Sequence, residues 1–197
     1  QDRLGPMNVG KWGLLQVFAD LLKLFQKEDI VPENAQKRLF LFAPWIIFLS
    51  VFGAFAVIPL SSGTFLQGSQ TEMGLMLLMG IVSLDSLGIL LAGWTSNNKY
   101  SLLGAIRAAS QNISYELAMG LSIIAILMMT GSLSTKAIVE AQQNGHWNIL
   151  YQPMGFIIFL ICAFAECNRT PFDLPECETE LIGGYHTEYS SMKLGFY

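Results

Sequence analysis

One uncharged stretch decides the fold of this chain, and it is Leu39–Leu60, LFLFAPWIIFLSVFGAFAVIPL. As an α-helix it would span roughly 33 Å, and the hydrocarbon core of a bilayer is about 30 Å thick. The whole chain of 197 residues is only 13% charged, whereas soluble domains carry about 25%. A soluble all-α bundle would have to bury helices that lack a polar face. We therefore predict an integral membrane protein.

Three further apolar segments predict membrane helices. They are about Met73–Trp94, about Gln111–Gly131 and about Pro153–Glu166, of which the last is short for a full span. None alternates as the strands of a membrane β-barrel do. The predicted fold class is an all-α polytopic membrane protein with about four transmembrane helices. Residues 1–38 would form a segment on one membrane face, residues 39–166 the membrane region, and residues 167–197 an acidic loop and the start of another helix.

The basic residues predict the orientation. With four alternating helices, the N-terminal segment, the connection after the second helix (with Lys99 and Arg107) and the C-terminal tail share one side. That side holds ten of the 11 Lys and Arg residues, and only Lys136 lies on the other. Because basic loops stay on the cytoplasmic side, we expect the first side to be cytoplasmic or matrix-facing.

Residues 13–27 have a different pattern. Apolar side chains recur with a helical period, and a narrow polar stripe includes Asp20 and Lys23. The stretch is too charged to span the bilayer, so we predict an amphipathic helix at the same membrane face. The pattern alone leaves open whether this helix is a plain surface anchor or the wall of a functional cavity.

Asp85, Glu116 and Glu166 lie within or at the end of apolar segments. An isolated charge at mid-bilayer costs about 2.5–3.5 kcal/mol on insertion scales, so such acids face the protein interior or water. They are candidates for a proton relay. The structural alternative is a hydrogen bond that holds helices together.

The segment 166–180, ECNRTPFDLPECETE, is called the acidic segment below. It places five carboxylates (Glu166, Asp173, Glu176, Glu178 and Glu180) close to one cation, Arg169, at the end of an apolar run. Its two prolines prevent a regular helix through it. Crowded carboxylates titrate together, and Arg169 could bind one of them bidentately. Composition alone does not separate this interpretation from a solvated acidic loop.

Other chemistry is not indicated. The three cysteines, Cys162, Cys167 and Cys177, form no CxxC pair, and neither histidine lies at ligand spacing from them. We therefore expect free thiols and no metal site. No basic stripe for nucleic acid and no nucleotide-binding or hydrolase motif is present.

Three groups of residues, in order along the chain, resemble the signatures of one family. The first is Gln1–Pro6, Val9–Gly10, Gly13–Gln16, Ala19–Asp20, Lys23 and Lys27–Glu28. The second is Ala92–Trp94, Asn98–Tyr100, Leu103–Gly104, Arg107 and Ser114–Glu116. The third is Glu166, Asn168–Arg169, Pro171–Leu174, Glu176, Glu178, Glu180–Leu181, Gly184 and Glu188–Ser190. Together they resemble the quinone-site membrane subunit of respiratory complex I.

The resemblance implies a role for particular residues. Glu116, Glu166, Glu176, Glu178 and Glu180 match an acidic proton path. Arg169, Asp173 and Glu188 match the same loop region, and Asp20 and Lys23 match positions near a quinone chamber. No motif surrounds Asp85, which would join the path only as an intramembrane acid.

The resemblance also implies partners and a setting. The substrate would be a quinone, and no cofactor would be covalently bound. Iron–sulfur clusters and flavin would lie in partner subunits. The partners would be the quinone-site and iron–sulfur subunits of the hydrophilic arm, small membrane-arm subunits and the lipid bilayer. The membrane would be the bacterial plasma membrane or the mitochondrial inner membrane. The chain would be part of a longer protein, without its N-terminal helix and C-terminal helices.

Three rival functions stay open at this level. The first is the homologous membrane subunit of a membrane-bound hydrogenase, which uses no quinone. The second is an independent ion transporter, for which inverted repeats would be typical; we find no repeat. The third is a structural anchor, in which neutralising the acids would have no effect.

Overall fold

The computed structural model describes residues 5–6, 9–58, 72–143, 147–168, 171–172 and 183–196. Its elements are helices, and no strand occurs in these ranges. In order they are η1 (Lys11–Gly13), α1 (Gln16–Gln26), α2 (Lys37–Val57), α3 (Gly74–Val82), α4 (Leu84–Thr95), α5 (Lys99–Thr130), α6 (Thr135–Gln143), α7 (Asn148–Tyr151), α8 (Pro153–Glu166), η2 (Gly184–His186) and η3 (Ser191–Phe196).

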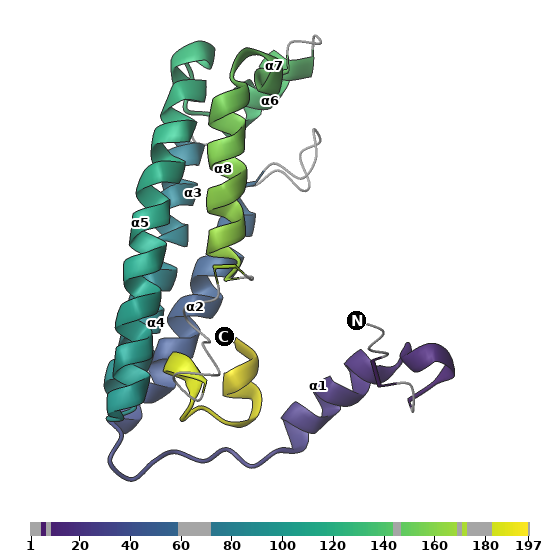
Figure 1. Cartoon of the computed structure of the whole chain (residues 1–197), viewed down its shortest axis with the longest axis vertical. Coiled ribbons are helices and arrows are strands. Elements are labelled where there is room, and N and C mark those ends of the chain that lie inside the picture. The colour runs from purple at the N-terminus through teal and green to yellow at the C-terminus, as the bar shows by residue number, and fades with distance from the viewer. Residues whose placement is uncertain are drawn as a thin grey trace.

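The predicted all-α membrane fold is confirmed. Within the described ranges, three helices are long and apolar enough to cross a bilayer: α2, the α3–α4 pair and α5. The fourth apolar helix, α8, has 14 residues, or about 21 Å, and is shorter than a full span, as its sequence suggested. The amphipathic helix is also present, as α1 (Figure 1).

The prediction for the start of the third membrane helix was wrong. This helix begins at Lys99 rather than near Gln111, so Lys99 and Arg107 lie in α5 and not in a loop. The Asn98 side chain starts this helix, because its Oδ1 accepts a hydrogen bond from the Tyr100 amide at 2.9 Å. Hydropathy detects only the apolar part of a helix, and at 32 residues α5 extends about 48 Å.

Close approach of small residues holds the bundle together. Helix α4 packs between α2 and α5, and α8 packs along α5 (Figure 1). At Gly93 of α4, a Cβ atom would lie 2.8 Å from the carbonyl oxygen of Ser101 and would clash with the Cβ of Ala105. Only glycine allows this separation of α4 and α5, which is typical of helix contacts within membranes.

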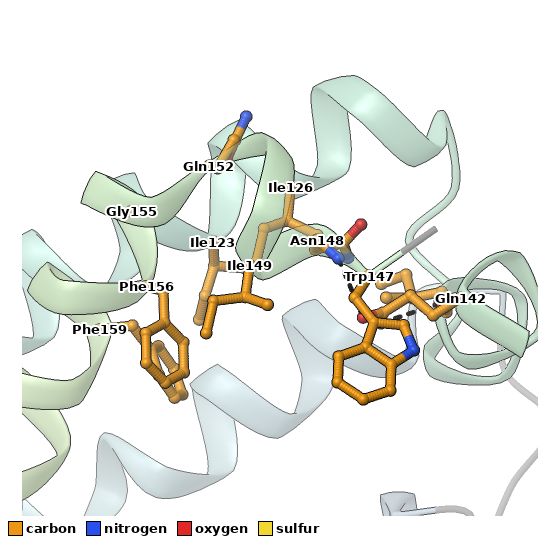
Figure 2. A pocket seen from close by; sticks show the side chains of 11 residues that line it. Ile123, Ile126, Gln142, Trp147, Asn148, Ile149, Gln152, Gly155, Phe156 and Phe159 are labelled. Carbon is orange, nitrogen blue, oxygen red and sulfur yellow. Dashed lines mark hydrogen bonds between the residues drawn. The ribbon is translucent and has the colours of Figure 1, made fainter. Parts of the chain in front are cut away.

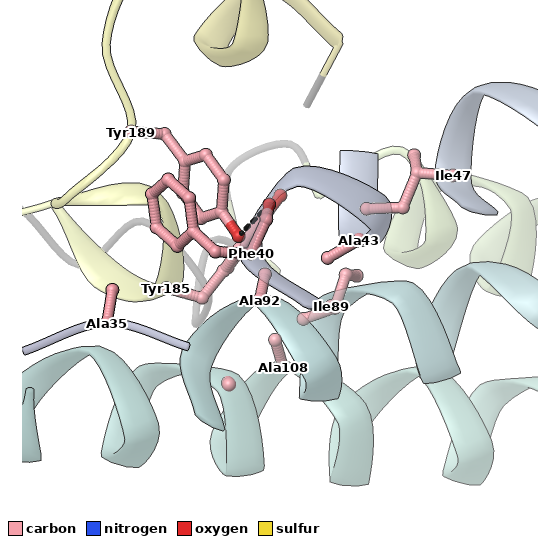
Figure 3. Packing of buried hydrophobic residues seen from close by; sticks show 10 residues of the cluster. Ala35, Phe40, Ala43, Ile47, Ile89, Ala92, Ala108, Tyr185 and Tyr189 are labelled. Atoms are coloured by element: carbon pink, nitrogen blue, oxygen red, sulfur yellow. Dashed lines mark hydrogen bonds between the residues drawn. The ribbon is translucent and has the colours of Figure 1, made fainter. Parts of the chain in front are cut away.

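The core lies at the end of the bundle that carries the C-terminal segment (residues 183–196). Phe40 of α2 is fully buried and stacks on Tyr189, with ring centroids 4.0 Å apart (Figure 3). Pro44 lies one helical turn after Phe40 and has no N–H, so it cannot donate to the Phe40 carbonyl. The Tyr189 hydroxyl donates to that carbonyl instead, at 3.2 Å. The proline thus creates the acceptor to which the C-terminal segment binds.

The C-terminal segment also connects α1 to the bundle. Its η2 packs on α4 and α5, and its η3 packs on α1 and α2. The Ser191 hydroxyl donates to the Leu24 carbonyl at 3.2 Å. The Lys193 ammonium lies 2.6 Å from the Asp29 carboxylate. These contacts place the amphipathic helix at the same end of the molecule as the start of α5 (Figure 1).

Candidate functional site

Three acids foreseen from the sequence meet in one cavity. Asp85 comes from α4, Glu116 from α5 and Glu166 from the last residue of α8. This acid cavity is lined by Val82, Asp85, Asn112, Tyr115, Glu116, Met119, Cys162 and Glu166. The acids are far apart in the sequence, so only the packing of α8 and α4 against α5 brings them together.

Helical spacing explains which neighbours share the cavity. Asn112, Glu116 and Met119 follow each other at intervals of four and three residues and therefore lie on one face of α5. Cys162 and Glu166 have the same relation on α8. The spacing explains why each acid shares a helix face with these neighbours, but the sequence does not show which helices face one another.

The acid cavity is narrow and charged. It leaves about 10 Å³ for the centre of a water molecule, about the room that one water needs. All three acids are half-buried. The three carboxyl groups line the same narrow space, so they repel one another when ionised. Such a site favours states in which the acids share protons or a water separates them.

Asn112 supplies an unpaired acceptor at this cavity. Its side chain is only 6% exposed, and its Oδ1 has no hydrogen-bond partner within the described ranges. A buried polar atom without a partner is costly, so such atoms bind water, ions or protonated groups. The carbonyl can therefore accept from a water or a protonated carboxyl group in the cavity. Sequence reasoning missed Asn112, and its spacing of four residues from Glu116 is the signal that could have indicated it.

The remaining predicted site residues lie elsewhere. Asp20 and Lys23 are exposed on α1, where the Gln16 amide donates to Asp20 Oδ1 at 3.0 Å. Glu188 accepts a hydrogen bond from Asn98 Nδ2 at 2.7 Å. The structure therefore joins Glu188 to the start of α5 and does not include it in the acid cavity. Of the acidic segment, five predicted residues lie outside the described residues: Arg169, Asp173, Glu176, Glu178 and Glu180.

The cysteines occupy different surroundings. Cys162 is buried in the wall of the acid cavity, and Cys167 is exposed just after α8. Cys177 lies outside the described residues. In the ranges that the structure describes, no group of His, Cys, Asp and Glu side chains is arranged to hold a metal ion.

Two larger cavities are mainly apolar. One of about 340 Å³ lies among α3, α5, α6 and α8 and reaches Glu166. The other, of about 370 Å³, lies at the far end of the bundle beside α6 and α7. Figure 2 shows Phe156, Phe159, Ile123 and Trp147 around it. Both are lined by Ile123, Ile126, Ile138 and Phe159, so they are neighbours along α5.

Comparison with known proteins gives a consistent result. The family model described as NADH dehydrogenase matches residues 1–197. Three similar proteins are H subunits of NADH-quinone oxidoreductase. The chain is 55% identical to one from Cytophaga hutchinsonii, covering 60% of that protein, and 53% identical to one from Flavobacterium johnsoniae, covering 58% of it. It is 52% identical to the one from Bacillus cytotoxicus, covering 59% of it. Each match includes all of this chain.

These relatives are longer proteins, and the chain spans about 60% of the length of the curated relatives it matches. The match nevertheless includes every helix and the three acids of the acid cavity, because it extends over all of residues 1–197. The chain belongs to the NADH dehydrogenase family.

Proposed function

We propose that the chain is the membrane subunit of a proton-translocating NADH:quinone oxidoreductase. It would help to form a quinone chamber and would connect quinone reduction to a path of membrane acids. Its relatives are named as parts of an NADH-quinone oxidoreductase, which supports the quinone substrate over a hydrogenase partner. The partners would be the quinone-site, iron–sulfur and small membrane-arm subunits of that complex, and the setting a bacterial plasma membrane or an organellar inner membrane.

The acid cavity is the observation that carries this proposal. Asp85, Glu116 and Glu166 come from three helices and meet around the space of about one water. Each ionised acid within the membrane costs about 2.5–3.5 kcal/mol on insertion scales. The cost of three such acids disfavours a purely structural role, which uncharged polar residues could fill. A proton relay requires acids grouped around one small space, because proton transfer needs heavy atoms that lie within hydrogen-bond reach or are joined through one water.

The order of events follows from the position of the acids along the chain. Glu166 ends α8 and begins the acidic segment, so it is the acid of the cavity that a change in that segment would reach first. Quinone reduction would change the charge or position of Glu176, Glu178 and Glu180. A proton would then pass from Glu166 to Glu116 or Asp85, while Asn112 accepts a hydrogen bond from the protonated partner or the water between them.

Electrons would come from partner subunits. Iron–sulfur clusters and flavin supply electron transfer when they are bound there, and this chain contributes protonatable groups. Asp20 and Lys23 of α1 would lie near the quinone chamber. Arg169 would hold one carboxylate of the acidic segment in its ionised form.

The test is neutralisation of the cavity acids in the intact complex. Glu116→Gln and Glu166→Gln keep the side-chain shape but remove proton transfer, so quinone reductase activity should fall at least about tenfold. Electron transfer from NADH to an artificial acceptor that bypasses quinone should be unchanged. Both rates would be measured in membrane vesicles together with proton uptake.

Glu140→Gln is the matched control, because Glu140 lies on α6 and is exposed beside Lys136 at 3.8 Å. It should leave all three measurements as in the parent. Full quinone reduction and full pumping in Glu116→Gln and Glu166→Gln would rule out the relay.

A further inference from the structure

Gln111 is a buried side chain that the proton path does not use. It lies on α5 directly before Asn112, and it is only 6% exposed. Its amide nitrogen donates to the carbonyl oxygen of Phe172 at 2.8 Å and to that of Ala165 at 3.4 Å. One nitrogen therefore contacts the end of α8 and the chain just before Asp173.

The chemistry of these contacts defines the orientation of the amide. A glutamine nitrogen carries two hydrogens and can serve two carbonyl acceptors, whereas its oxygen would be repelled by both. The 2.8 Å bond has full hydrogen-bond geometry, and the 3.4 Å contact is the weaker of the two. Without Gln111 the Phe172 carbonyl would lose a buried donor, which costs more than an average hydrogen bond contributes.

Phe172 has a second contact with α5. Its ring meets the Tyr115 ring edge-on, with centroids 5.5 Å apart and planes at 74°. Tyr115 lines the acid cavity beside Glu116. The residue that precedes Asp173 is therefore held at both its backbone and its side chain by the helix that carries Glu116.

We infer that Gln111 is a positioning residue that fixes the start of the acidic segment relative to the acid cavity. It holds Ala165 and Phe172, which flank Glu166 and the chain that follows it, against one turn of α5. A displacement of Phe172 would thereby reach Glu166 and Tyr115. This inference rests on the proposed function, since it names the residue that connects the acidic segment to the relay.

The test replaces Gln111 with Met in the full-length subunit of the intact complex. Methionine keeps the length and burial but removes both donated hydrogen bonds. Misplacement by about 1 Å can cost a reaction about 10²-fold, so we expect at least about a tenfold loss of quinone reductase activity and fewer protons pumped per electron. Electron transfer to the artificial acceptor should be unchanged.

Gln152→Met is the matched control. Its amide nitrogen donates to the Ala125 carbonyl at 3.1 Å and so connects the start of α8 to the same helix, α5, at the opposite end. The same chemical change at that end should leave the number of protons per electron unaltered. Loss of complex through misfolding would lower both rates in parallel and would not change this ratio.

Two results would overturn the inference: an unchanged proton-to-electron ratio in Gln111→Met while electron transfer to the artificial acceptor is normal, or an equal fall of the ratio in Gln152→Met. If Glu116→Gln and Glu166→Gln abolish pumping while Gln111→Met does not, only the inference about Gln111 fails. If the acid variants themselves pump normally, the proposed function fails instead.

Discussion

A single proline explains how the C-terminal segment recognises α2. Pro44 leaves the Phe40 carbonyl without its usual helical donor, and the Tyr189 hydroxyl takes that place at 3.2 Å. The two rings stack over the same contact. Because Phe40 is fully buried, water cannot substitute for the hydroxyl, and the pair is specific for tyrosine over phenylalanine.

Tyr189→Phe should therefore destabilise the full-length subunit by about 1–3 kcal/mol, the range for a buried acceptor that loses its donor. The stacked ring is kept, so the loss reports the hydroxyl alone. Pro44→Ala supplies a backbone donor to Phe40, and in that background the same substitution should cost clearly less. Thermal unfolding in lipid nanodiscs would measure this coupling in a double-mutant cycle.

An additive cycle would contradict the explanation, because it would mean that Pro44 and Tyr189 act independently. Tyr189→Leu serves as a second measure, since it removes the stacking as well and should be worse than Tyr189→Phe in either background.

From the sequence alone, charged site residues were easier to identify than amide side chains. Asp85, Glu116 and Glu166 are conspicuous because each interrupts or ends an apolar run. Gln111 and Asn112 are not conspicuous, because an uncharged amide gives no signal until its surroundings are known to be dry. Their burial arises from α8 packing on α5, which no local pattern predicts.

At the scale of elements, Asn98 links two parts of the structure. Its Oδ1 caps α5 through the Tyr100 amide at 2.9 Å, and its Nδ2 donates to Glu188 at 2.7 Å. The start of the long helix and the position of the C-terminal segment thus depend on one side chain. Aspartate would preserve the cap but face Glu188 with a second carboxylate.

Asn98→Asp should keep α5 intact and detach the C-terminal segment. Hydrogen exchange of the full-length subunit should show faster exchange for residues 184–196 and unchanged exchange at Tyr100. Adding Glu188→Gln returns a donor opposite the aspartate, so the double variant should regain protection. Equal exchange throughout α5 and the C-terminal segment in all variants would disprove the link.

Most helices could be identified from the sequence, but the residues at which several of them begin or end could not. The 3.6-residue pattern identified α1, and the long apolar runs identified α2, α3–α4 and α8. The early start of α5 was missed because Lys99 and Arg107 interrupt the apolar pattern of its first turns. The break at Ser83 between α3 and α4, and helix α6, also carry no strong sequence signal.

At the scale of the whole molecule, the distribution of basic residues and the arrangement of the helices predict the same orientation in the membrane. Helix α1, the start of α5 and the C-terminal segment gather at one end, while α6 and α7 lie at the other (Figure 1). The sequence assigns ten of the 11 Lys and Arg residues to the first side, and Lys99 and Arg107 remain near that end in the first turns of α5. That end should face the cytoplasm or the mitochondrial matrix.

Cysteine labelling can measure this orientation. In a full-length variant whose cysteines are replaced by serine, Ala141→Cys on α6 should react with a membrane-impermeant maleimide added on the side opposite the cytoplasm or matrix. Glu33→Cys, before α2, should react only after the membrane is opened. Both positions are exposed, so reagent access depends on the side alone, and the reversed result would overturn the assignment.

The set of membrane helices was predictable from the sequence, but the contacts between segments far apart in the chain were not. Apolar run lengths determine how many helices enter the membrane. The docking of residues 183–196 on α1, on α2 and on the connection between them includes contacts such as that of Ser190 with Ile30, 160 residues apart. No periodicity connects positions so distant, so a single sequence contains little signal for them.

Because Ile30 and Ser190 are 160 residues apart, the two partners are synthesised at different times. At about 5–20 residues per second, roughly 8–30 s pass between the synthesis of Ile30 and that of Ser190, its partner at 2.9 Å. During this interval α1 has left the ribosome without the segment that docks it, and its apolar side chains, which stay exposed in the folded chain as well, can rest on the lipid surface. A chain that stops before residue 183 therefore lacks the contacts that dock this helix, so the position of α1 is decided only when synthesis of the C-terminal segment is complete.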